Sequence, residues 1–215
     1  YDTKQAVAFA KYAAGIGADV LMVLPPDWSG SNTPETLAAH YAAVAEHIPV
    51  MLVTNLFIPR GTPFGLETVR RALDLSPNIV SIKDDMGSDF IRKVALMASD
   101  RCAIWAGGLK QNHIHMAPYG GVGYLSTWLT FRPEIAWKYW NAWKAGDIST
   151  ATGVIKEHEI PFFDYVRGKP GNFDAGIHAM LELAGLAKRW RPHPYHSYSD
   201  EEMERFRDYV KANKL

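Results

Sequence analysis

Residues 77–87, PNIVSIKDDMG, carry the most structural information in the chain. An apolar run of strand length ends here in Lys83, and two carboxylates and a glycine follow. Side chains alternate along a strand, so Ser81 and Lys83 share one face while Val80 and Ile82 share the other. If the strand belongs to a closed barrel, Val80 and Ile82 face the surrounding helices. Lys83 then points inward at the C-terminal rim, where barrel enzymes hold their catalytic groups.

Apolar strands alternate with helices on both sides of this segment. Helical spacing of apolar residues, with Gly or Pro at the boundaries, separates runs that are apolar nearly throughout, which is typical of a parallel sheet covered by helices. The alternation contains five βα units and is compatible with a doubly wound sheet or a barrel. The predicted strands are 20–24, 49–55, 79–83, 102–106 and 122–127, and the predicted helices are 3–16, 34–47, 66–74, 88–98, 110–117 and 132–145.

The strands stop after residue 147, and only helical patterns follow. We predict helices over 149–166, 173–188 and 199–213, the last beginning with a capping box of Ser199 and Glu202. The chain is therefore expected to divide into a sheet-forming part, 1–147, and a helical C-terminal extension, 148–215.

Composition argues against several classes of partner. Lys plus Arg and Asp plus Glu both number 23 among 215 residues, so no net charge favours nucleic acid or an anionic membrane surface. No apolar run approaches the roughly 20 residues of a membrane-spanning helix. The single Cys102 excludes an internal disulfide, and the histidines lack ligand spacing, so we predict no metal site. A cytoplasmic location is the default expectation.

Lys83 has two interpretations from spacing alone. A lysine amine attacks a ketone only when it is unprotonated, and an inward, partly desolvated position favours the uncharged amine. The alternative is that Lys83 merely extends into solvent where its strand meets a loop, as lysines at the ends of elements commonly do.

Four segments, in their order and spacing, resemble the dihydrodipicolinate synthase and N-acetylneuraminate lyase family of class I aldolases and dehydratases. They are GADVLMVLPP (17–26), PVMLVTN (49–55), PNIVSIKDDMG (77–87) and GGVGYLST (120–127). The resemblance implies an α/β fold, a (β/α)8 TIM barrel with strands four to eight in residues 1–147. It also implies that Lys83 forms the Schiff base with pyruvate or another 2-oxo acid, without a cofactor, in a homo-oligomer such as a dimer or tetramer.

The sequence departs from this family in three places. The tyrosine that shuttles protons in the family falls on Val53 or Thr54, so we expect Thr54 to orient a water at most. After the fourth strand the family's tyrosines are replaced by a segment containing Asp27 and Trp28, to which we give little weight. The first three strands are absent; because five parallel strands cannot close a barrel, we expect the natural molecule to contain more chain.

Several further residues are candidates for binding the substrate. Arg60 resembles the family's arginine that contacts a substrate carboxylate, Gly107 and Gly108 would leave room for a ligand, and Lys110 would attract an anionic group or else lie on the surface. Ser126 and Thr127 are weaker candidates at the barrel rim.

The sequence thus predicts a Schiff-base lyase, an aldolase or dehydratase acting on a 2-oxo acid through Lys83 with Thr54 as an auxiliary group. The alternative is a non-catalytic barrel relative that binds a metabolite in a regulatory or assembly role, which loss of the tyrosine favours. A flavin or sugar-phosphate barrel is disfavoured because Gly120–Gly123 precedes a strand instead of following one.

Overall fold

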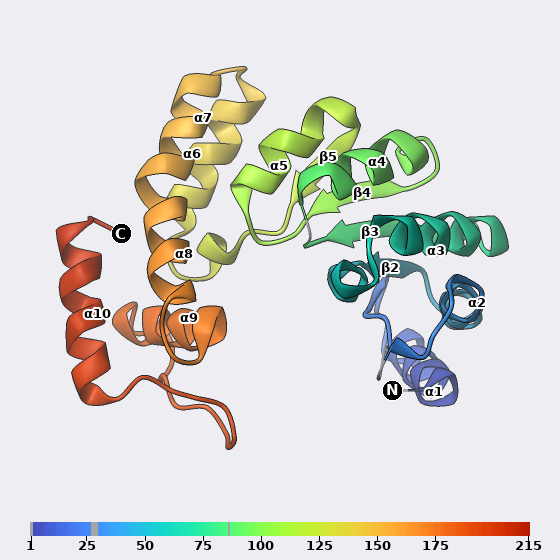
Figure 1. Cartoon of the computed structure of the whole chain (residues 1–215), viewed down its shortest axis with the longest axis horizontal. Helices are drawn as coiled ribbons and strands as arrows, with labels where there is room; N and C mark the ends of the chain where they lie inside the picture. The colour runs from blue at the N-terminus through green and yellow to red at the C-terminus, as the bar shows by residue number, and fades with distance from the viewer. Residues whose placement is uncertain (1, 27–29, 86) are drawn as a thin grey trace. The chain divides into compact units, whose positions relative to one another are not determined.

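A computed structural model describes residues 2–26, 30–85 and 87–215 and divides into two compact units, Tyr1–Leu125 and Ser126–Leu215. The first unit contains a sheet of five parallel strands in the order of the sequence (Figure 1). The strands are β1 (Leu21–Val23), β2 (Val50–Val53), β3 (Ile79–Asp84), β4 (Ala103–Ala106) and β5 (Gly121–Tyr124). This arrangement confirms the predicted series of βα units, with β3, the strand that ends in the lysine motif, at the centre.

The helices of the first unit follow the predicted order. They are α1 (Thr3–Gly15), α2 (Pro34–Ala45), α3 (Thr62–Leu75), α4 (Ser88–Ala98) and α5 (Lys110–Met116), with short 3-10 turns η2 (Asn55–Arg60) and η3 (Ala117–Tyr119). Two begin with capping boxes, in which Asp2 pairs with Gln5 and Thr33 with Thr36. The apolar core lies where the buried faces of these helices meet the strands, and Leu52, Ile82 and Ile104 on three neighbouring strands are all completely buried.

One expectation about strand β3 is wrong. Val80 was predicted to share a helix-covered face with Ile82, yet Ile82 is fully buried and Val80 is 37% exposed. The pairing with β2 explains the difference, because Val50 aligns with Ile79 and Met51 with Ser81, so the register skips Val80. Such a bulge breaks the strict alternation of side chains at that residue.

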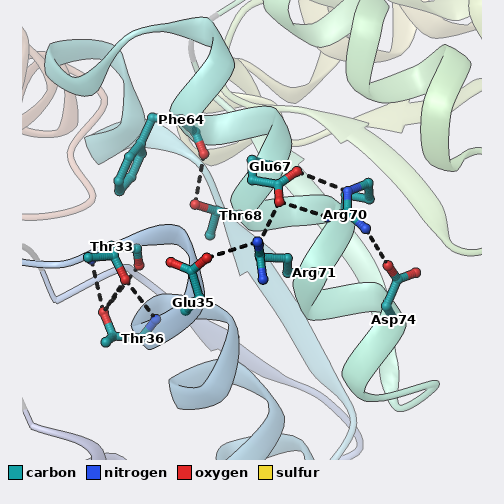
Figure 2. Close-up of polar contacts among 9 residues, drawn as sticks. All are labelled: Thr33, Glu35, Thr36, Phe64, Glu67, Thr68, Arg70, Arg71 and Asp74. Carbon is teal, nitrogen blue, oxygen red and sulfur yellow. Dashed lines mark hydrogen bonds and ion pairs between the residues drawn. The ribbon is translucent and has the colours of Figure 1, made fainter.

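Charged side chains connect helices α2 and α3 (Figure 2). Arg71 of α3 lies 2.8 Å from Glu35 of α2 and also binds Glu67, which in turn binds Arg70; Arg70 reaches Asp74 one turn later. The hydrogen bond from Arg70, helped by Arg71, lowers the pKa of the Glu67 carboxyl to about 2. The pairs are exposed, so each adds little to stability.

The second unit is helical. It comprises η4 (Thr127–Thr130), α6 (Pro133–Lys144), α7 (Ile148–Val154), a π-helical turn η5 (Ile155–Glu159), α8 (Ile160–Arg167), α9 (Asn172–Leu183) and α10 (Asp200–Ala212). Its core is aromatic: the rings of Trp128, Phe131 and Phe162 contact one another, and Phe162 also contacts Phe206. The predicted capping box of Ser199 and Glu202 is confirmed at the start of α10.

Several predicted boundaries are wrong. The helix predicted over 66–74 starts four residues earlier, with Pro63 in its first turn. The strand predicted to reach residue 127 ends at Tyr124, and the chain turns into η4 at Thr127. The helix predicted to reach 188 ends at Leu183, since Gly185 has a positive φ of 72° that no helix accommodates. The helix predicted over 149–166 starts one residue earlier and contains the π-helical turn. The predicted domain boundary at residue 147 stays a prediction.

Candidate active site

The carboxyl ends of the strands meet at one edge of the sheet. The backbone N–H of Thr54 donates to the carbonyl of Lys83 (3.1 Å), and that of Gly107 donates to the carbonyl of Asp84 (2.6 Å). Leu125 continues the pattern by donating to Ala106 (2.9 Å). These bonds hold the carboxyl-terminal ends of β2, β3, β4 and β5 next to one another, where parallel α/β sheets place their functional groups.

Lys83 lies near the end of the central strand with its side chain only 16% exposed. In the parallel register it lies between Val53 of β2 and Trp105 of β4. Its Nζ is 2.5 Å from Oδ2 of Asp85, in the bend that follows the strand. The amine therefore lies against neighbouring protein groups, contrary to the interpretation of Lys83 as a side chain that simply extends into water.

Asp84 anchors the start of this bend. It is fully buried, and its carboxylate accepts a hydrogen bond from the hydroxyl of Thr54 and one of 2.7 Å from the backbone N–H of Gly87. The hydroxyl of Thr54 is thus directed at Asp84. The predicted auxiliary catalytic role of Thr54 stays a prediction, and the geometry shows it fixing a carboxylate next to the lysine.

Val53 occupies the register position beside Lys83 on the neighbouring strand. It is 1% exposed and pairs directly with Lys83, whereas Thr54 is one residue further along. An apolar side chain therefore lies at one of the two positions, Val53 and Thr54, onto which the resemblance maps the family's tyrosine.

Two glycines, Gly107 and Gly108, follow β4. A Cβ placed on Gly107 would come within 1.6 Å of Oδ1 of Asp85, so the room that this glycine leaves is occupied by the Asp85 carboxyl group. Gly108 is partly exposed in the bend that follows. The assignment of both glycines to substrate binding stays a prediction.

Lys110 is completely buried at the start of α5, so the alternative of a surface lysine is wrong. Its Nζ is 5.9 Å from the ring centroid of Tyr124, and the ring of His113 lies 5.4 Å from the same centroid. Burial lowers the pKa of His113 to about 4. The role of Lys110 as an anion-binding group stays a prediction.

Arg60 ends the 3-10 turn after β2. Its Nη2 donates to the backbone carbonyl of Asn32 (2.7 Å), and its guanidinium carbon lies 4.1 Å from the ring centroid of Phe64. These contacts orient the guanidinium, and its predicted binding of a substrate carboxylate stays a prediction. Asp27 and Trp28 lie outside the described residues.

Ser126 and Thr127 begin the second unit. Ser126 precedes η4, and its Oγ is buried without a hydrogen-bond partner among the described residues. Thr127 is the first residue of that turn. Their predicted contact with substrate stays a prediction.

The sequence analysis did not identify Asp85 and Trp105 as neighbours of Lys83. The signal for Asp85 was present, because two carboxylates directly follow the lysine, but only the bend after β3 shows which of them turns back to the amine. Trp105 had no local signal, since its place beside Lys83 depends on the register between strands. Among the described residues, no group of three His, Cys, Asp or Glu side chains is arranged to hold a metal, and no helix has the length and hydropathy to cross a membrane.

The five parallel strands in sequence order, with a lysine near the carboxyl end of the central one, define the class, an α/β protein built from successive βα units as in a (β/α)8 barrel. The model of the Dihydrodipicolinate synthetase family matches residues 1–213. The chain belongs to this family.

Similar curated proteins carry two kinds of name. A probable 5-dehydro-4-deoxyglucarate dehydratase of Rhizobium meliloti is 28% identical over 218 residues, covering 100% of this chain and 71% of the relative. A probable dehydratase of the same name from Acidovorax ebreus is 30% identical over 85% of this chain and 59% of its own length. A 4-hydroxy-tetrahydrodipicolinate synthase of Acidiphilium cryptum is 29% identical over 75% of this chain and 55% of its own length.

Solved structures of the family share the fold. A putative dihydrodipicolinate synthetase of Pseudomonas aeruginosa has a TM-score of 0.81 at 23% identity, over 99% of this chain and 72% of its own. YagE, a prophage protein of E. coli K12 solved in complex with pyruvate, has a TM-score of 0.81 at 20% identity, over 100% of this chain and 72% of its own. The chain spans less than two thirds of the length of most of the curated relatives it matches.

Proposed function

We propose that this protein is a Schiff-base lyase in which Lys83 condenses with the ketone of a 2-oxo acid. The observation that carries the proposal is the position of the Lys83 amine, partly buried at the carboxyl end of the central strand with an acidic group in contact. The resulting iminium withdraws electrons from the neighbouring carbon, which is the requirement shared by aldol cleavage and by dehydration.

Dehydration of an acidic sugar derivative is the favoured reaction. The name shared by most of the similar curated proteins, 5-dehydro-4-deoxyglucarate dehydratase, denotes a dicarboxylate whose ketone adjoins both a carboxylate and a methylene group. An iminium at that ketone acidifies the methylene hydrogen, and loss of this proton lets the hydroxyl on the next carbon leave as water. Arg60, oriented by Asn32 and Phe64, suits one carboxylate of such a substrate.

The rival is a non-catalytic relative that binds a metabolite in a regulatory or assembly role. Val53 beside Lys83 favours the rival, because it supplies no proton carrier where the family resemblance implies one. The partly buried amine disfavours it, because withdrawing a lysine from water without a task costs stability.

Borohydride trapping distinguishes the two. The protein is incubated with pyruvate or a 4-deoxy-5-oxo sugar diacid and reduced, and the intact mass and the modified peptide are measured. We expect a covalent adduct on the peptide containing Lys83, its loss in Lys83→Ala, and its retention in the control Lys93→Ala, which removes an exposed lysine of α4. Absence of any adduct, or an adduct that persists in Lys83→Ala, would refute the proposed lyase.

A further inference from the structure

Asp85 is the acidic group in contact with the amine. Its Oδ2 lies 2.5 Å from Nζ of Lys83, and the two side chains are only 29% and 16% exposed. Partial withdrawal from water strengthens the interaction between opposite charges, and the short contact gives a proton a direct path between the two groups. The contact is therefore suited to moving a proton as well as to holding the lysine in place.

The neighbouring carboxylate is already committed elsewhere. Asp84 is fully buried and accepts hydrogen bonds from Thr54 and from the backbone of Gly87. These bonds fix the direction of the chain after β3, so the next residue, Asp85, turns its side chain back to Lys83. The two consecutive acids thus have different tasks.

The end of β4 leaves space for the Asp85 carboxyl group. Gly107 donates its N–H to the carbonyl of Asp84 at 2.6 Å, which brings the two backbones close. A Cβ on Gly107 would lie 1.6 Å from Oδ1 and 2.6 Å from Cγ of Asp85. Only glycine admits the carboxyl group at this position, so the arrangement depends on residues from two strands.

We propose that Asp85 is the proton carrier of the Lys83 reaction, in place of the phenol that Val53 cannot provide. This inference rests on the proposed function. The Asp85 carboxylate first accepts a proton from the Lys83 ammonium, and the neutral amine adds to the ketone carbon, forming the N–C bond while the carbonyl electron pair moves to oxygen. A second nitrogen proton passes to that oxygen, giving a neutral carbinolamine. Protonated Asp85 then gives its proton to the hydroxyl, the C–O bond breaks and water leaves. The iminium remains, and Asp85 is again a carboxylate.

The test compares the rate of iminium formation with the final amount of adduct. Wild type, Asp85→Asn, Asp85→Glu and the control Asp89→Asn, which removes an exposed carboxylate of α4, are mixed with pyruvate. Samples are reduced with borohydride at successive times from pH 5 to pH 9. Proton transfer by a positioned side chain typically contributes 10²–10⁴-fold, so we expect Asp85→Asn to react about 100-fold more slowly near neutral pH. Its rate should also lose part of its dependence on pH, Asp85→Glu should recover part of the rate, and Asp89→Asn should match wild type.

A second measurement separates this inference from the proposed function. Labelling of the Lys83 amine by acetic anhydride is followed against pH without any 2-oxo acid. Removing the paired carboxylate in Asp85→Asn should change the rate at which Lys83 is labelled, because the amine loses the acidic group that it contacts. If neither the wild type nor any variant forms an adduct, the lyase proposal fails. The labelling experiment alone then decides whether Asp85 controls the proton on Lys83. An Asp85→Asn protein with the trapping rate and labelling profile of wild type would overturn the inference.

Discussion

Replacing Thr54 with valine removes one hydroxyl and keeps the shape of the side chain. Thr54 is fully buried and donates to the carboxylate of Asp84, which is also fully buried. A hydrogen bond to a charged group contributes about 1.5–3 kcal/mol to stability, and a buried acceptor that loses a donor regains no water. We therefore expect Thr54→Val to lower the free energy of unfolding by about 2 kcal/mol. The same change should loosen the bend that directs Asp85 to Lys83.

Unfolding by urea is monitored by tryptophan fluorescence, and borohydride trapping is measured on the same samples. Thr68→Val is the matched control, because Thr68 is equally buried but donates to a backbone carbonyl of its own helix, Phe64 at 2.8 Å (Figure 2). That change removes only a neutral hydrogen bond and should cost about 0.5–1 kcal/mol. Thr54→Ser retains the hydroxyl and should keep most of the trapping rate.

Equal destabilisation by Thr54→Val and Thr68→Val would refute the reasoning, since it would show that the contact with Asp84 has no special value. A trapping rate that stays at the wild-type level in Thr54→Val would show that the bend does not need this anchor. Loss of trapping in Thr54→Val with unchanged stability would instead favour a direct catalytic role for Thr54.

Three further predictions concern single residues. Gly107→Ala should displace Asp85, whose Oδ1 lies 1.6 Å from the new Cβ, and slow trapping at Lys83 about as much as Asp85→Asn; an unchanged rate would contradict the proposed geometry. Burial lowers the pKa of His113 from 6.5 to about 4, so the unfolded chain binds a proton in this window that the folded chain does not. The burial of neutral His113 therefore costs no stability above pH 6.5, whereas the free energy of unfolding falls by up to about 3 kcal/mol towards pH 4. His113→Gln should flatten the pH dependence of urea unfolding over this range. Arg60→Lys keeps the charge but loses the bidentate fork, so the concentration of the 4-deoxy-5-oxo sugar diacid giving half-maximal trapping should rise about tenfold; an unchanged concentration would contradict the contact between Arg60 and a carboxylate of that substrate.

Local patterns predicted the order of elements because each depends on neighbours in the sequence. Apolar runs of strand length, helical spacing and the capping residue Ser199 place the elements within a few residues of their observed bounds. The errors occur where local preference is overridden. β5 ends early at Tyr124, and the π-helical turn interrupts a helix that periodicity predicts as continuous.

The sequence by itself determined that a lysine follows an apolar run of strand length and that two acids follow the lysine. Covalent order alone requires these facts, and alternation of side chains then places Lys83 on a defined face. Only the tertiary structure decided which acid contacts the amine, that Val53 and Trp105 flank it, and that Lys110 is buried. The physical reason is that register between strands, the bulge at Val80 and the space above Gly107 arise from contacts between segments far apart in the chain, which no local pattern encodes.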